Sequence, residues 1–117
     1  MRGGNKQMTD NNNAVLRYIM LSTCHLSQAD ALTLAYLSDP IESEEKHSHE
    51  WIHNTGMHNG YLIRLDARAD ALGELRALGI SDPLYATLAL LKTSLNVSMI
   101  HFDSEADVLT GLPVYDW

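Results

Sequence analysis

The feature that most constrains the fold of this chain is a leucine stripe in its carboxyl-terminal half. The stripe repeats at intervals of four, three and four residues, as one face of an α-helix does, and consists of Leu84, Leu88, Leu91 and Leu95. Asp82 precedes it as an expected helix N-cap, with Pro83 at the first helical position. In a chain of only 117 residues, we expect this helix to bury its stripe in its own core rather than in a dimer seam.

Three short apolar runs predict the strands of a sheet, at residues 14–21, 60–65 and 97–102. The first run carries only one charge, which predicts a strand buried on most of both faces. Two further helices are predicted between the strands, over residues 27–38 and 67–78. Ser27 and Asp30 form an approximate capping box for the first of these helices, and Gly79 suits a left-handed end of the second.

The predicted order of elements is β-α-β-α-α-β, which is typical of an α/β or α+β domain with a small sheet and three helices. The sheet has three strands, or four if residues 51–55 pair with residues 61–65 as an antiparallel hairpin. Helical crossovers permit parallel pairing of the strands they connect. Residues 1–13 have almost nothing to bury and predict a flexible leader, which places a single globular domain at 14–117.

Charge and cysteine content exclude several classes of protein. Fifteen acidic residues against eight Lys and Arg give a formal net charge of −7, which disfavours direct binding to nucleic acid or to an anionic membrane. Cys24 is the only cysteine, and no apolar stretch approaches the ~20 residues that span a bilayer. We expect a cytoplasmic protein that binds a protein partner with a basic surface, such as a nucleic-acid-binding protein. The acidic residues proposed to face this partner are Glu42, Glu44, Glu45, Asp103, Glu105 and Asp107.

The string His49-Glu50-Trp51-Ile52-His53 matches the H-E-x-x-H pattern of zinc peptidases. On a helix, this spacing aims two imidazoles at one zinc ion while the glutamate polarises the bound water. His58 comes one residue too early for the third ligand of the longer form of the motif. On a strand, residues four apart lie about 13 Å from each other and cannot share one ion. The alternative to a protein without a cofactor is a zinc-dependent hydrolase that uses His49, Glu50 and His53. The candidate metal ligands are His49, His53 and His58.

A second candidate site lies where the first and last strands end. If these strands are parallel neighbours, their carboxyl ends form the edge at which open α/β sheets bind ligands. The residues of this candidate pocket are Ser22, Thr23, His25, His101 and Asp103. They predict a small-ligand-binding module. The alternative is that Ser22 or Thr23 completes the hydrogen bonding of the strand-to-helix turn and that Cys24 is a buried small apolar residue.

The carboxyl-terminal residues 112–117 concentrate apolar side chains around Pro113, which keeps them out of a helix. Leu112, Val114, Tyr115 and Trp117 are the apolar residues of this tail. A segment of this composition either folds back to fill the edge of the core or serves as a docking peptide.

Three segments together resemble one uncharacterised family of short proteins, encoded on plasmids, prophages and integrative elements of proteobacteria. They are Leu21-Ser22-Thr23-Cys24-His25-Leu26, Gly60-Tyr61 and Leu112-Pro113-Val114-Tyr115-Asp116-Trp117. The family has a Ser-Thr-Ala-His-Leu-like turn, a Tyr-Gly-Trp-like strand and a Leu-Pro-x-x-Asp-Trp-like end. This chain departs from it at Cys24, where the family has alanine, and in a longer His-rich insert before the second strand.

The resemblance implies a setting in mobile genetic elements, where small acidic proteins often bind host or defence machinery. Together with the charge and the lack of a coherent catalytic set, it makes a non-enzymatic binding protein the leading hypothesis. In its most specific form, that protein inhibits a host defence nuclease such as a CRISPR-like complex.

Overall fold

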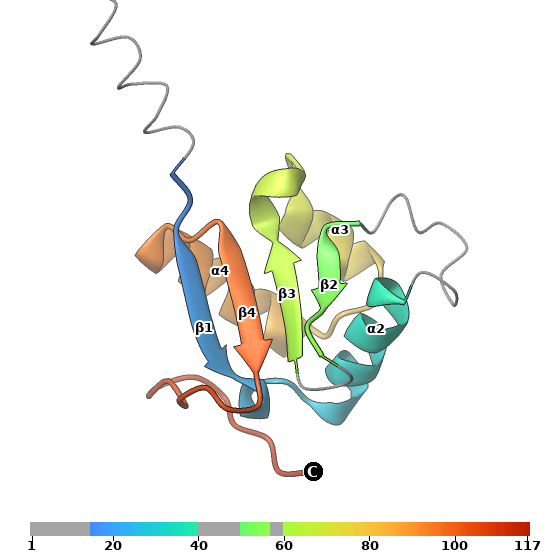
Figure 1. The fold of residues 1–117 in the computed structure, drawn as a ribbon, viewed down its shortest axis with the longest axis vertical. Coiled ribbons are helices and arrows are strands. Elements are labelled where there is room, and N and C mark those ends of the chain that lie inside the picture. The colour runs from blue at the N-terminus through green and yellow to red at the C-terminus, as the bar shows by residue number, and fades with distance from the viewer. Residues whose placement is uncertain (1–14, 40–49, 57–59) are drawn as a thin grey trace, which may run out of the picture.

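The structure is a computed structural model, and it describes residues 15–39, 50–56 and 60–117. Over these residues, four strands form one sheet and three α-helices lie on one of its faces (Figure 1). The strands are β1 (Tyr18–Ser22), β2 (Ile52–Asn54), β3 (Gly60–Arg64) and β4 (Met99–Asp103). The helices are α2 (Gln28–Ser38), α3 (Ala71–Ala77) and α4 (Asp82–Leu95), with 3₁₀ turns η1 (Thr23–His25) and η3 (Leu65–Ala67). The expected leader, 1–13, lies outside the described residues.

The sheet has the strand order β1-β4-β3-β2. β1 and β4 are parallel neighbours and place Ser22 opposite Asp103, whereas β3 runs antiparallel to both β4 and β2. The predicted fold class is confirmed in its four-stranded form, because β2 and β3 form the antiparallel hairpin. The sheet is mixed, so the domain is of the α+β kind.

Side-chain alternation along the strands separates a covered face of the sheet from an open one. Ile100 and Phe102 of β4 are fully buried on the helix side, and the intervening His101 belongs to the opposite face. The prediction that the first strand is buried on most of both faces is wrong. Tyr18 and Met20 are 46% and 45% exposed, because the described helices cover only one face.

Gly60 allows β3 to approach β4 closely at the start of the strand. A Cβ atom at this position would lie 2.0 Å from the carbonyl oxygen of Phe102. Any side chain there would separate the two strands, which is the physical reason for glycine. The neighbouring Tyr61 is buried on the helix side of the sheet.

The predicted helices form, with shifted ends. Leu84, Leu88 and Leu91 of the leucine stripe are buried in the core, as expected, but Leu95 at the end of α4 is 40% exposed. The N-cap of α4 is Ser81 rather than Asp82, because the extended backbone of Ser81 lets its hydroxyl accept a hydrogen bond from the Leu84 amide. The helix predicted over 67–78 begins later, at residue 71, because residues 65–67 form η3. Gly79 has the expected positive φ, 115°.

The carboxylate of Asp30 joins the beginnings of α2 and α4. It is 2% exposed and accepts hydrogen bonds from the Ser27 hydroxyl at 3.0 Å, the Ser81 amide at 2.8 Å and the Ser81 hydroxyl at 2.6 Å. Ser27 in turn caps α2 by accepting from the Asp30 amide, as the capping box predicts. The positive ends of two helix dipoles therefore meet one buried negative charge.

Candidate functional site

His25 fastens the carboxyl-terminal segment to the turn after β1. Its ring is 2% exposed, Nδ1 donates to the carbonyl oxygen of Pro113 at 2.7 Å, and Nε2 accepts from the Leu109 amide at 2.9 Å. These two partners require the neutral tautomer with its proton on Nδ1, since Nε2 has to offer a lone pair. His25 therefore links the turn after β1 to Leu109 and Pro113, which lie 84 and 88 residues further along the chain.

The rest of the tail continues along the same turn. The Tyr115 amide donates to the carbonyl oxygen of Cys24 at 2.8 Å, and the Trp117 indole Nε1 donates to that of Leu26 at 2.8 Å. Leu109 and Leu112 pack against the core. The tail thus folds back, but its aromatic end does not fill the core edge, because the Trp117 side chain is 61% exposed.

An apolar hollow of about 230 Å³ lies between Trp117 and α2. Its lining residues are Thr23, Leu26, Gln28, Ala31, Leu32, Ala35, Tyr61 and Trp117. Leu32 is 66% exposed, so the hollow has a large apolar side chain at its rim in addition to the exposed indole of Trp117. The sequence contains one signal for this surface. Leu32 and Tyr36 lie four residues apart in α2, away from its buried side chains.

The same end of the molecule is acidic. Asp103, Glu105, Asp107 and Asp116 lie in residues 93–117, a stretch that contains no Lys or Arg. Within the described ranges, Glu105, Asp107 and Asp116 form no ion pair.

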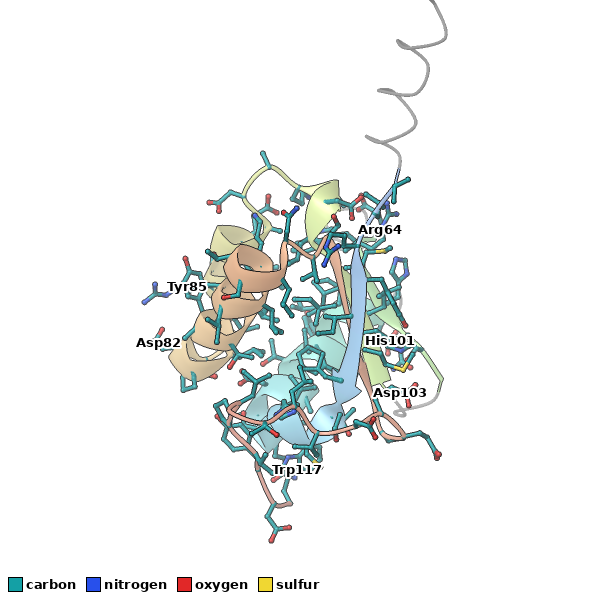
Figure 2. All side chains as sticks on the ribbon, turned by 90° about the vertical axis from the view of Figure 1, so that its left-hand side faces the viewer. Arg64, Asp82, Tyr85, His101, Asp103 and Trp117 are labelled. Carbon is teal, nitrogen blue, oxygen red and sulfur yellow. The ribbon has the colours of Figure 1, made fainter. Side chains whose placement is uncertain are left out.

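Three of the five Lys and Arg residues in the described ranges form ion pairs with other acidic residues. Arg64 pairs with Asp66, Arg68 with Glu50 and Glu74, and Arg76 with Asp82. Because β3 and β4 are antiparallel, Arg64 and Asp103 lie at opposite ends of the sheet, as Figure 2 shows. The charges of the described residues are therefore segregated, and among these residues Glu105, Asp107 and Asp116 have no Lys or Arg as an ion-pair partner.

A polar cluster forms on the open face of the sheet. The Tyr18 hydroxyl hydrogen-bonds to His101 Nδ1, while Nε2 of this histidine lies 3.3 Å from Thr55 Oγ1 and 3.6 Å from Asp103 Oδ2. Partial burial and the nearby Asp103 carboxylate raise the pKa of Tyr18 above its ordinary value of 10.0. The phenol therefore stays protonated at neutral pH.

We expect Tyr18→Phe to reduce the loss of stability at alkaline pH. The pKa of Tyr18 is higher in the folded chain than in the unfolded one, so its stabilising effect is full below the unfolded pKa and disappears as pH rises through the folded pKa. Denaturant unfolding at pH values on both sides of 10, together with phenolate absorbance, measures this. Tyr61, whose pKa is also raised by burial, stays in both proteins. Identical alkaline profiles would contradict the prediction.

The structure does not bring the residues of the candidate pocket together at one site. Ser22 is buried, and its Oγ accepts from the Cys24 amide, as the turn alternative expects, while Thr23 lines the apolar hollow. His25 faces the tail. His101 and Asp103 lie together on the sheet face away from α4 (Figure 2).

The expectation that Cys24 is buried is wrong, because this residue is exposed. It lies in the middle of η1, where its backbone carbonyl, not its side chain, contacts the tail. Its thiol has no packing role of the kind expected from the sequence.

Only part of the zinc motif is described. His53 lies exposed on β2, a strand, so the helical geometry that aims residues four apart at one ion is missing at this position. Glu50 pairs with Arg68. His49 and His58, as well as Glu42, Glu44 and Glu45, lie outside the described residues. Among the residues that are described, no group of three or more His, Cys, Asp or Glu side chains is placed to hold a metal ion.

The fold and the site define a small α+β domain whose carboxyl-terminal segment is fastened across a strand-to-helix turn, beside an apolar hollow and an acidic end. Residues 18–117 match the C-terminal domain of a family of unknown function, DUF5983, and the chain belongs to this family. No curated protein and no solved structure matches the chain. In the described ranges, no helix combines the length and the apolar character needed to cross a membrane.

Proposed function

We propose that this protein is a non-enzymatic binding protein that recognises a basic protein partner through its acidic end. The observation that supports the proposal best is the segregation of charge. Glu105, Asp107 and Asp116 form no ion pair in the described structure, whereas Asp66, Glu74 and Asp82 each pair with an arginine. Such unpaired carboxylates keep their full attraction for a partner's cations.

The partner we propose is a nucleic-acid-binding protein, because such proteins present the basic surfaces that an acidic end complements. In the mobile-element setting that the family resemblance implies, this partner is a host defence nuclease, and the protein inhibits it in the cytoplasm by occupying its nucleic-acid channel. Glu42, Glu44 and Glu45 lie outside the described residues and stay candidate contacts for the same partner. Electrostatic attraction of this kind raises the association rate and weakens as salt rises.

The test compares two variants with equal changes of net charge. The acidic-end variant combines Glu105→Gln, Asp107→Asn and Asp116→Asn, and the control combines Asp66→Asn, Glu74→Gln and Asp82→Asn. The control removes only exposed ion pairs, which are worth about 0–1 kcal/mol each. Each protein serves as bait in a host-cell lysate at low and at high salt.

We expect the parent and the control variant to capture a basic nucleic-acid-binding protein at low salt, and the acidic-end variant to lose it. The captured protein should then lose nucleic-acid binding when the parent is added in purified form. Equal capture by both variants, or no capture at either salt, would remove the basis of the proposal.

A further inference from the structure

We infer that the apolar hollow between α2 and Trp117 receives one large apolar side chain from a basic segment of the partner protein. This inference rests on the proposed function and specifies the occupant of one part of the binding surface. It commits to a protein segment with an aliphatic or aromatic residue flanked by Lys or Arg.

The walls of the hollow are suited to hold such a side chain in place. Leu26 and Ala31 form a buried floor, and the exposed Leu32 stands at the rim. The Trp117 indole is tied at one edge by its hydrogen bond to the carbonyl oxygen of Leu26, which leaves 61% of the side chain exposed. A ring already fixed in the free protein loses little entropy on binding, and tryptophan is enriched among the residues that dominate interface energies.

The lining of the hollow has no charged side chain, which favours an apolar occupant. Thr23, Gln28, Tyr61 and Trp117 are its only lining residues with polar side-chain atoms, and none of the four side chains carries a charge at neutral pH. A charged side chain inserted here would lose its hydration without gaining a partner. An aliphatic or aromatic side chain gains about 1.5–3 kcal/mol from burial.

Charge complementarity sets the chemistry of the flanking residues. Apart from Tyr61, the hollow is built from residues 18–39 and 93–117, and neither stretch contains a Lys or Arg. Asp116 directly precedes Trp117 and forms no ion pair in the described part of the chain. The flanks of the occupant therefore meet negative charge, which favours Lys and Arg there. A second copy of this chain, with its net charge of −7, fits this surface poorly.

The experiment titrates the full chain with short peptides of the form Lys-Lys-Gly-X-Gly-Lys-Lys, in which X is Leu, Phe or Ala. Twin peptides carry Ser or Glu in place of every Lys. We expect the Lys peptides with Leu or Phe to bind at least tenfold more tightly than the Ala peptide, with NMR shifts centred on Leu32 and the Trp117 indole. The Ser twins should bind more weakly and the Glu twins not measurably.

Leu32→Glu and Leu90→Glu form a matched pair of variants. Leu32 lies at the hollow, whereas Leu90 is 52% exposed on α4 and does not line it. Both substitutions add one negative charge at an exposed helical site, so a weaker interaction in only one of them cannot come from the change of net charge. We expect Leu32→Glu to abolish the preference for Leu and Phe over Ala, and Leu90→Glu to keep it. Melting curves check that both variants fold.

The outcomes separate this inference from the function on which it rests. Lys peptides that bind equally with Leu, Phe or Ala at X would overturn the apolar occupant and leave the acidic-end proposal intact. Ser twins that bind as tightly as Lys peptides would overturn the basic flanks. Failure of every Lys peptide would count against both proposals. Self-association of the parent that Leu32→Glu removes would show a second copy as the occupant and overturn the inference.

Discussion

Replacing Asp30 with alanine is expected to lower the free energy of unfolding by about 3–5 kcal/mol, one of the two largest effects of a single substitution that we predict. The carboxylate accepts three hydrogen bonds at a site that is 2% exposed. Its removal leaves the Ser81 amide without its acceptor beside the N-terminus of α4. An unsatisfied buried donor costs about 1–3 kcal/mol, and the two helix dipoles also lose their shared negative charge.

Urea unfolding followed by circular dichroism measures this effect, with Asp116→Ala as the control. Asp116 is an exposed carboxylate without an ion pair in the described structure, so its removal should change stability by less than about 0.5 kcal/mol. Asp30→Asn should fall between the two, because an amide keeps one acceptor oxygen but loses the negative charge. A cost below about 1 kcal/mol for Asp30→Ala would show that water replaces the carboxylate, and that the bridge between α2 and α4 contributes little.

The helices and strands could be predicted because their signals are local. The leucine stripe of α4, the capping box at Ser27 and the hairpin of β2 and β3 depend on spacings of a few residues. The parallel pairing of β1 and β4 is one arrangement that helical crossovers permit, and the structure has it. The exposure of one face of β1 could not be predicted from the sequence. The number of sheet faces that three helices cover depends on packing between distant segments.

The candidate site was harder to predict for the same reason. His25 follows the apolar strand β1 and His101 lies within β4, but η1 turns the His25 ring toward the tail, while His101 stays on the open face of the sheet. The Asp30 bridge links residues 51 positions apart, and the contact between Trp117 and Leu26 links residues 91 apart. No local sequence pattern predicts contacts between residues so far apart in the chain. The exposed apolar pair of Leu32 and Tyr36 in α2 is a local signal, and it indicates an interaction surface.

Replacing His25 with alanine is expected to cost about 3–5 kcal/mol and to release the carboxyl-terminal segment from the turn after β1. The substitution leaves the partly buried Leu109 amide without an acceptor, at about 1–3 kcal/mol, and removes a fully buried ring, which adds a cavity cost. Hydrogen exchange of the Leu109 amide should accelerate toward that of an open segment. Denaturant unfolding gives the free-energy change.

Two conservative variants separate the hydrogen bonds from the packing of the ring. The asparagine amide reaches the place of Nδ1 and retains the bond to Pro113, whereas the glutamine amide reaches that of Nε2 and retains the bond to Leu109. Each should recover part of the stability that alanine loses. Deleting residues 115–117 leaves both His25 partners in place and removes a largely exposed indole, so it should cost less than His25→Ala. If the deletion lowered the free energy of unfolding by more than His25→Ala does, Trp117 rather than His25 would hold the tail. The indole would then have a structural role instead of forming the wall of a binding hollow.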